Sequence, residues 1–226
     1  MIGLIGGTLL PETRLLGECE ERSVDTPYGG VDLLAGPDAA FINRHRGDVP
    51  PHRVNHRANI WALKSLTDTV IGVGSAGSLK AGLTPPVIIV PSDYIELEPV
   101  TFYDEEIKHV TPGFDEDLRN SILRVAGENG IKVQGGVYYQ TRGPRLETKA
   151  EIRMMADYAD IVGMTIGSEA TLAREAGLKY AAICCADNFA HGIADEKLDF
   201  EAVKEISRKN SILVEELLAE VLEELR

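Results

Sequence analysis

Polar residues stand at three joints between predicted strands and helices within residues 135–192. Glu147 opens a helix, Met164 and Thr165 end a strand, and Asn188 follows an apolar run. In open α/β sheets, ligands bind beyond the ends of the strands. These residues therefore predict a site for one small polar ligand that has several hydrogen-bonding edges.

The elements that must hold these residues alternate between strands and helices. Apolar runs predict buried strands over residues 2–5, 69–73, 87–90, 133–139, 161–164 and 180–186. Apolar residues at helical spacing predict helices over 54–66, 118–129, 168–176 and from 199 onward. A capping-box sequence from Thr148 to Glu151 predicts the start of one more helix.

Residues 10–53 carry turn signals at 26–30 and 50–51 and are predicted to be irregular. Strands that alternate with helices are typical of a sheet covered on both faces. The sequence therefore predicts one α/β domain over residues 1–226, a three-layer α/β/α sandwich with a central mixed sheet.

Composition narrows the classes of partner. The chain has 226 residues, 44% of them hydrophobic, and a formal net charge of −13. A chain this acidic is not expected to attract nucleic acid or an anionic membrane. The apolar stretch at the N-terminus lacks the basic residues of a signal peptide and is interrupted at Pro11, so we expect a cytoplasmic protein.

The three cysteines, Cys19, Cys184 and Cys185, have neither the spacing of a zinc site nor that of a disulfide framework. Cys184 and Cys185 lie within an apolar run, which favours their interpretation as small core residues. No metal site is predicted.

Residues 72–77 satisfy the pattern GxGxxG after a strand, which is a signal for dinucleotide binding. The motif needs a helix directly after it, and Gly82, Pro85 and Pro86 leave no room for one. What remains is a predicted glycine-rich turn at the end of a strand, able to present backbone N–H groups to an anion.

Several further motifs occur in one order along the chain. They are GLIGGT near the start, NRH at 43–45, VNHRANIWALKSL, SAGSL, TFYD at 101–104, GPRLET at 143–148, VGMT at 162–165 and SEATLAREAGL at 168–178. With these motifs the chain resembles the trimeric purine nucleoside phosphorylase and methylthioadenosine phosphorylase family over nearly its whole length. The resemblance implies that phosphate cleaves a purine nucleoside to free base and a ribose 1-phosphate, without a metal or an organic cofactor.

The resemblance also implies a set of phosphate-binding groups. They are Thr8, Arg44, His45, the backbone around Gly74 and Ser75, and Thr165. The glycosidic bond breaks with oxocarbenium character, so the enzyme must hold phosphate under the sugar and stabilise a purine that gains negative charge. Arg44 suits phosphate through its forked donors. Outside this family context, residues 44–46 would be interpreted as a solvated basic loop.

Glu147 and Asn188 match the positions that contact the base in 6-oxopurine members of the family, and Met164 and Ala190 match further nucleoside contacts. A carboxylate at Glu147 can accept the N1–H of hypoxanthine or guanine but repels adenine N1, and Asn188 can donate to N7 or O6. Asp187 stands where the family usually has threonine. A shift of one residue would put this carboxylate on the base and favour adenine instead.

The pocket for the 5′ end of the sugar involves two further positions. Phe200 matches a histidine that binds the 5′-hydroxyl in ordinary purine nucleoside phosphorylases, and its ring suits a methylthio group; it equally fits the apolar face of a helix. His109 matches a residue that closes the pocket from a neighbouring subunit, which implies a homotrimer or a dimer of trimers. The expected substrate is 5′-methylthioinosine, with methylthioadenosine, or inosine and guanosine, as alternatives.

Two other functions stay open at this point. A nucleoside hydrolase on a related fold would use water and show no dependence on phosphate. A regulatory module that binds a dinucleotide at residues 72–77 would show no turnover.

Overall fold

The middle layer of the molecule is a sheet built around two long parallel strands, β5 (Thr69–Ser78) and β11 (Lys179–Phe189). The computed structural model describes residues 1–10, 15, 19–194 and 200–225, without the side chains of 200–209. Within this described part the sheet has 11 strands in parallel and antiparallel pairs, and the predicted mixed sheet is confirmed.

The two edges of β5 have different neighbours. β11 runs along one edge for its full length. The other edge pairs first with β1 (Ile2–Gly6), as far as Gly72, and then with β10 (Ile161–Gly163), from Gly77 onward. Between these two positions this edge has no strand partner among the described residues, which leaves a gap in the sheet.

The remaining strands extend the sheet on both sides. β10 continues through β9 (Val137–Gln140) to β7 (Asp93–Glu96), and β11 continues through β6 (Val87–Ile89) to β8 (Val133–Gln134). The single strand predicted over 133–139 is thus two short strands, because β8 and β9 pair with different neighbours.

The prediction that residues 10–53 are irregular is wrong. β4 (Ala39–Asn43) runs parallel to β1, β3 (Gly29–Ala35) is antiparallel to β4, and β2 (Glu20–Thr26) forms the outer edge. β2 has the sequence EERSVDT and is largely exposed, so it lacks the apolar run that identifies a buried strand. The turn predicted at 26–30 is the connection between β2 and β3.

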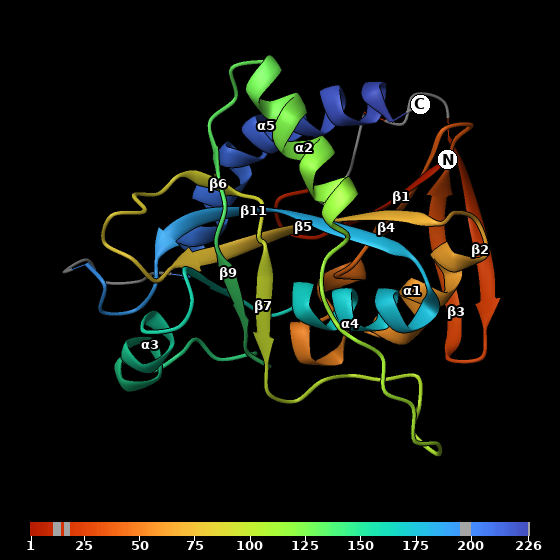
Figure 1. Ribbon diagram of the computed structural model, residues 1–226, viewed down its shortest axis with the longest axis horizontal. Coiled ribbons are helices and arrows are strands. Elements are labelled where there is room, and N and C mark those ends of the chain that lie inside the picture. The colour runs from red at the N-terminus through yellow and green to blue at the C-terminus, as the bar shows by residue number, and fades with distance from the viewer. Residues whose placement is uncertain (11–14, 16–18, 195–199, 226) are drawn as a thin grey trace.

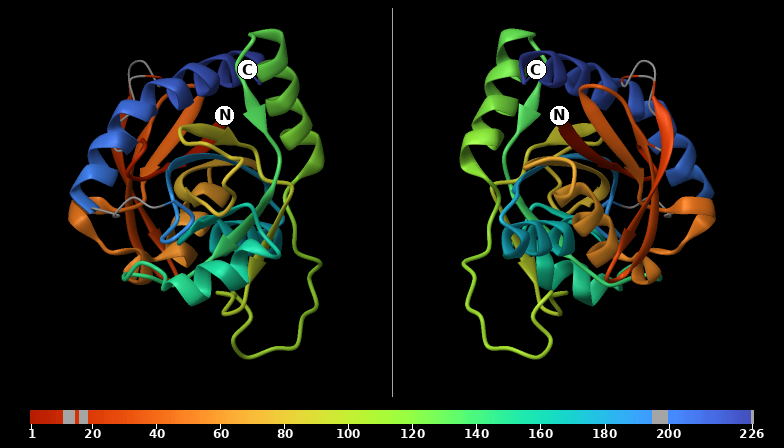
Figure 2. Two further views of the ribbon diagram at one scale, coloured as in Figure 1. Left: turned by 90° about the vertical axis from the view of Figure 1, so that its left-hand side faces the viewer. Right: turned by 90° about the vertical axis from the view of Figure 1, so that its right-hand side faces the viewer.

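Helices cover both faces of the sheet. α1 (His56–Lys64) and α4 (Ile166–Ala176) pack together on one face, and α2 (Glu116–Glu128) and α5 (Phe200–Glu224) pack together on the other (Figures 1 and 2). Separate apolar clusters fill the space between each pair of helices and the sheet. The predicted three-layer α/β/α architecture is confirmed.

A smaller helix, α3 (Lys149–Ala156), lies beside β9 and β10 and shares a third apolar cluster with them. It begins at the predicted capping box, in which Thr148 Oγ1 accepts from Glu151 N and the Glu151 carboxylate accepts from Thr148 N. Two short 3₁₀ helices, η1 (Arg46–Asp48) and η2 (Pro51–Arg53), lie between β4 and α1. No helix among the described residues is long and apolar enough to span a membrane.

The glycine-rich stretch 72–77 is not the predicted turn but part of the interior of β5. A Cβ at Gly72 would overlap Tyr180 Oη, and a Cβ at Gly74 would lie 3.0 Å from Ile166 Cγ1. These two positions are glycine because buried side chains of β11 and α4 reach the strand, and no turn of the backbone is involved.

Candidate active site

The gap beside β5 opens into a cavity of about 590 Å³. Segments that follow β1, β4, β10 and β11 form its wall, together with the segment before α3. Nine residues singled out from the sequence line this cavity: Thr8, Arg44, His45, Ser75, Glu147, Met164, Thr165, Asn188 and Ala190. The fold therefore brings residues from both ends of the chain to one place.

Parallel pairing of β1 with β4 places the ends of these two strands side by side, with Gly6 opposite Asn43. Arg44 N then donates to Gly6 O at 2.7 Å. Thr8 follows β1 and is exposed at the cavity. The register of this strand pair is the reason why Thr8 and Arg44 reach the same wall.

Thr165 is the N-cap residue of α4, yet its side chain makes no capping hydrogen bond. The Tyr138 hydroxyl accepts instead from Thr165 N at 3.2 Å and from Ile166 N at 3.5 Å. Gly163 leaves room for this hydroxyl, because a Cβ there would overlap it. The Thr165 hydroxyl is therefore not used to cap α4, and Thr165 lies on the cavity wall.

Arg44 is buried at the cavity and is held mainly by protein groups. Its Nε and Nη2 donate to the two carboxylate oxygens of Glu169, at 2.5 and 3.0 Å. Nη1 donates to Val73 O at 2.9 Å and Nη2 also to Ile5 O at 3.2 Å. The forked edge that was expected to bind phosphate is thus occupied by Glu169. Because a guanidinium has five N–H donors, one N–H of Nη1 is left for a ligand.

Arg44 and Glu169 form a buried ion pair. Burial is the largest single influence on the pKa of Glu169 and would raise it, but the charge and hydrogen bonds of Arg44 together with His56 outweigh burial and bring that pKa down to about 2. Burial would likewise lower the pKa of Arg44, and the Glu169 charge raises it above the usual value. Both groups are therefore charged at neutral pH.

His45 has a defined tautomer. Its Nδ1 lies 2.8 Å from Val49 O, which can only accept, so Nδ1 carries the hydrogen and Nε2 is an acceptor. Burial, and next the Arg44 charge, lower the pKa of His45 below the usual value. His45 is therefore neutral at neutral pH and offers a basic nitrogen, which suits the single P–OH group of a phosphate dianion.

Ser75 contributes to the cavity chiefly through its backbone. Its Oγ donates to Asp187 Oδ2 at 2.5 Å. Val73 O faces the gap in the sheet, and the alternation along a strand turns the N–H of Ser75 to the same edge. Gly74 has its N–H on the opposite edge of the strand and is not among the described residues that line the cavity.

The register of β11 against β5 shifts between Ala186 and Asn188, so Asp187 is the extra residue of a β-bulge that stands directly before Asn188, the other candidate for contacting a base. Asp187 is 2% exposed and accepts from Ser75 and, at 3.0 Å, from Asn210 Nδ2 of α5. Asn188 lines the cavity, and its Nδ2 donates to the next residue's carbonyl at 2.8 Å. The amide of Asn188 thus lies at the cavity, while the carboxylate of Asp187 is committed to the core.

Glu147 lies one residue before the N-cap of α3 and is 8% exposed. Its Oε1 accepts from Thr141 Oγ1 at 2.6 Å, so Oε2 is the oxygen left for a ligand. Its backbone oxygen lies 3.2 Å from His191 Nδ1. His191 also lines the cavity and was not expected from the sequence, since no motif marks it.

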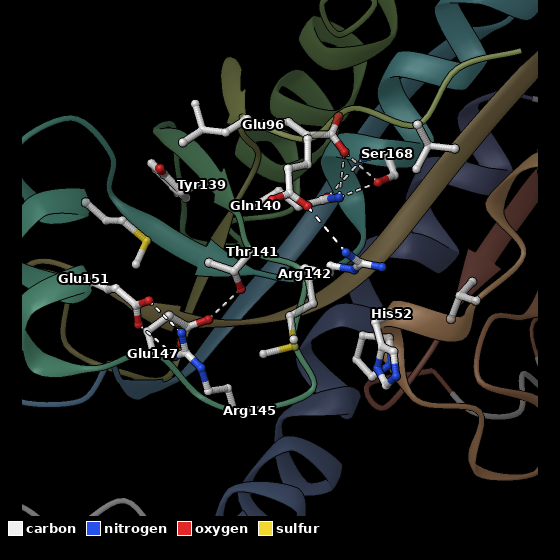
Figure 3. Close-up of a pocket in the computed structure, with 18 of the residues that line it drawn as sticks. His52, Glu96, Tyr139, Gln140, Thr141, Arg142, Arg145, Glu147, Glu151 and Ser168 are labelled. Atoms are coloured by element: carbon white, nitrogen blue, oxygen red, sulfur yellow. Dashed lines mark hydrogen bonds and ion pairs between the residues drawn. The ribbon is translucent and has the colours of Figure 1, made fainter. Parts of the chain in front are cut away.

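A neighbouring cavity of about 600 Å³ lies beyond Glu147 and Met164, which line both cavities. Figure 3 shows Glu96 on its wall, accepting from Gln140 Nε2 at 2.8 Å and from Ser168 Oγ at 2.6 Å. Burial raises the pKa of Glu96 above its usual value. This second group of polar residues makes no hydrogen bond or ion pair to Arg44.

Besides Gly74, one described residue singled out from the sequence, His109, does not line the 590 Å³ cavity. His109 is exposed in the loop 97–115, which projects from the body of the molecule (Figures 1 and 2). Phe200 is the first residue of α5, and its side chain lies outside the described residues.

Glu169 has no role in the prediction from motifs, although a signal for it exists. It stands among Ile166, Ala170 and Ala173 on the apolar face of α4, where an unpaired carboxylate would be costly. Elsewhere the core matches expectation, since Cys184 and Cys185 are buried and free. Among the described residues, no group of three or more His, Cys, Asp or Glu side chains is arranged to hold a metal.

Comparison with known proteins places this geometry in a family. The model of the phosphorylase superfamily matches residues 1–223. A probable 6-oxopurine nucleoside phosphorylase from Archaeoglobus fulgidus is 48% identical over 99% of this chain and 98% of its own. A probable S-methyl-5′-thioinosine phosphorylase from Methanothermobacter thermautotrophicus is 44% identical over 94% of this chain and 81% of its own.

Solved structures agree with these sequence matches. A methylthioadenosine phosphorylase from Schistosoma mansoni, in complex with adenine, superposes with a TM-score of 0.90 at 29% identity, covering 99% of this chain and 91% of that one. The resemblance inferred from the motifs is thereby confirmed. Matched from residue 1 to residue 223, and similar to such relatives over nearly its whole length, the chain belongs to the phosphorylase superfamily.

Proposed function

We propose that this protein cleaves a 6-oxopurine nucleoside with phosphate, and that its nucleoside is 5′-methylthioinosine. The products are hypoxanthine and 5-methylthioribose 1-phosphate. The observation that carries this proposal is that Glu147 and Asn188 line the same cavity as Arg44, His45 and Thr165. Groups suited to a 6-oxopurine and groups suited to phosphate thus stand at one site.

Phosphate would bind at the end of the cavity formed by the segments after β1 and β4. Thr8 and Thr165 supply hydroxyls, Arg44 supplies an N–H of Nη1, and Ser75 supplies its backbone N–H. His45 Nε2 accepts from the P–OH of the dianion. An oxygen of phosphate then bonds to C1′ as the C1′–N9 bond breaks, and the bonding electrons leave with the purine.

The base end would stabilise the departing purine. Glu147 Oε2 accepts the N1–H of hypoxanthine, and Asn188 donates to N7 or O6, where negative charge develops. Adenine carries an acceptor at N1, so the same carboxylate opposes it. Sites of this kind discriminate by up to about 10⁴-fold, because the wrong ligand leaves buried polar groups unpaired. Asp187 supports the 6-oxopurine assignment, since its carboxylate is bonded to Ser75 and Asn210.

The 5′ end of the sugar would lie against Met164, which lines the cavity. Phe200, the first residue of α5, is proposed to add an apolar ring at the same end of the sugar. An apolar surface there favours a methylthio group over a 5′-hydroxyl. Relatives named as 6-oxopurine nucleoside and S-methyl-5′-thioinosine phosphorylases support the same substrate class.

The enzyme would work in the cytoplasm, with phosphate as co-substrate and no other cofactor, as a homotrimer or a dimer of trimers. In such an assembly His109, on the projecting loop 97–115, closes the pocket of the neighbouring copy. Sedimentation analysis gives the number of subunits. If a His109→Ala variant has the same number of subunits as the wild type and the same KM for the nucleoside, His109 has no role in the substrate site.

The experiment that tests the proposal is release of free base from 5′-methylthioinosine, 5′-methylthioadenosine and inosine, each with and without phosphate. We expect phosphate-dependent cleavage, fastest with methylthioinosine. Faster cleavage of methylthioadenosine would contradict the base contacts given to Glu147 and Asn188. Cleavage without phosphate would indicate a hydrolase, and no cleavage at all would contradict an enzymatic role.

A further inference from the structure

Glu169 lies beneath β5, in a space that Gly72 leaves open. Its side chain is fully buried. A Cβ at Gly72 would overlap Tyr180 Oη and would lie 3.0 Å from Glu169 Oε2. The first glycine of the GVGSAG stretch therefore makes room for a tyrosine–glutamate pair, which has no part in the substrate contacts proposed above.

Both oxygens of the Glu169 carboxylate are held by several elements. Oε1 accepts from Arg44 Nε at 2.5 Å, with His56 Nδ1 of α1 at 3.6 Å. Oε2 accepts from Arg44 Nη2 at 3.0 Å and from the Tyr180 hydroxyl of β11 at 2.8 Å. The carboxylate cannot turn without breaking hydrogen bonds to β11 and to the segment after β4.

Arg44 is consequently oriented by the protein itself. Four of the five N–H groups of its guanidinium donate to Glu169, Val73 O and Ile5 O. The fifth, an N–H of Nη1, is left for a ligand in the cavity. A side chain that is already ordered loses no rotamer freedom when its ligand binds, and that loss would otherwise weaken binding by about ten-fold.

We propose that Glu169 is a positioning residue of the phosphate site: it holds the Arg44 guanidinium so that a single Nη1 N–H faces phosphate before phosphate binds. Tyr180 supports Glu169 from the far side. This inference rests on the proposed phosphorolysis, in which Arg44 contacts phosphate. It adds a residue that touches neither substrate and acts through Arg44 alone.

Two substitutions at Glu169 separate position from charge. Glu169→Asp keeps the charge but withdraws the carboxylate by about 1.5 Å, one carbon–carbon bond. Glu169→Gln keeps the length but removes the charge, and its amide can still accept one Arg44 hydrogen bond. If position matters most, the aspartate variant is the more affected of the two.

Steady-state kinetics with each substrate varied in turn is the measurement. In Glu169→Asp we expect the KM for phosphate to rise about ten-fold or more, and the KM for the nucleoside and kcat at saturating phosphate to stay within about two-fold. Glu169→Gln should lie between this variant and the wild type. Circular dichroism and thermal melting report whether each variant is folded.

Tyr180→Phe keeps the proposal testable even if both Glu169 variants fail to fold. It removes one hydroxyl and keeps the ring, so we expect a selective rise of about two- to five-fold in the KM for phosphate. Glu96→Gln is the control, because Glu96 is a half-buried carboxylate that accepts from Ser168, the neighbour of Glu169, yet has no contact with Arg44. Its KM for phosphate should stay at the wild-type value.

An equal change in both KM values, or a lower melting temperature with unchanged kinetics, would overturn the inference and leave Glu169 as part of a structural ion pair. A KM for phosphate that rises equally in Glu96→Gln would overturn it too. If the wild-type protein cleaves the nucleoside without phosphate, the proposed function itself is wrong. That result comes from the wild-type protein and does not depend on the Glu169 variants.

Discussion

Replacing Glu147 by glutamine tests the contact that would select the base. Glu147 is 8% exposed, and Thr141 Oγ1 already donates to its Oε1 at 2.6 Å. In Glu147→Gln the amide oxygen can keep the bond to Thr141, and the NH₂ group then faces the substrate. An NH₂ group opposes the N1–H of hypoxanthine but can donate to N1 of adenine.

The expected size of the effect follows from these contacts. Losing a hydrogen bond to a charged acceptor and leaving N1–H unpaired weakens the transition state for methylthioinosine by about 3 kcal/mol, or about 10²-fold in kcat/KM. A new bond to adenine N1 favours methylthioadenosine by about 1 kcal/mol, or about five-fold. The ratio of the two kcat/KM values should therefore shift by about 10³-fold.

The assay is initial-rate release of hypoxanthine and adenine at saturating phosphate. Thr141→Val is the control, because it removes the hydroxyl that holds Glu147 and keeps the carboxylate. It should lower kcat/KM for methylthioinosine by about five-fold, without reversing the preference for the 6-oxopurine. If the preference in Glu147→Gln, or in Glu147→Ala, remains that of the wild type, the assignment of base selection to this carboxylate is refuted.

Three further outcomes are expected. Gly72→Ala should lower the free energy of unfolding by about 2 kcal/mol in urea titration, since its Cβ overlaps Tyr180 Oη, and full stability would contradict the packing beneath β5. The pKa of Glu169 is about 2 in the folded protein against an ordinary 4.5, so its stabilisation is complete above about pH 4.5 and lost as pH falls toward 2. The stability difference between wild type and Glu169→Gln should shrink by about 3 kcal/mol over that range, and a difference independent of pH would refute the lowered pKa. Asp187→Ala should lower kcat/KM for methylthioinosine about ten-fold, because the bulge that turns Asn188 to the cavity loses its anchor; an unchanged value would show that the anchor is dispensable.

Local sequence patterns were enough to predict the three layers of the fold. The apolar runs at β1, β6 and β11 and the helical spacing at α1, α2, α4 and α5 lie close to their observed bounds, whereas β5 continues to Ser78, beyond its predicted end at residue 73. The edge strand β2 was beyond the same reasoning, because its residues are mostly exposed and carry no apolar run. A strand of this kind is held by its partner β3, and that pairing leaves no mark in β2 itself.

In the candidate site, too, the sequence predicted some features and only the tertiary structure decided others. Motifs named the groups that could contact a nucleoside and phosphate, since carboxylate, amide and hydroxyl chemistry belongs to each residue type wherever it lies. Which edge of Arg44 faces a ligand, and whether Asp187 or Asn188 faces the cavity, depend on Glu169 and on a bulge in β11. Such directions follow from contacts between segments far apart in the chain, because a side chain turns toward whichever partner the fold places beside it.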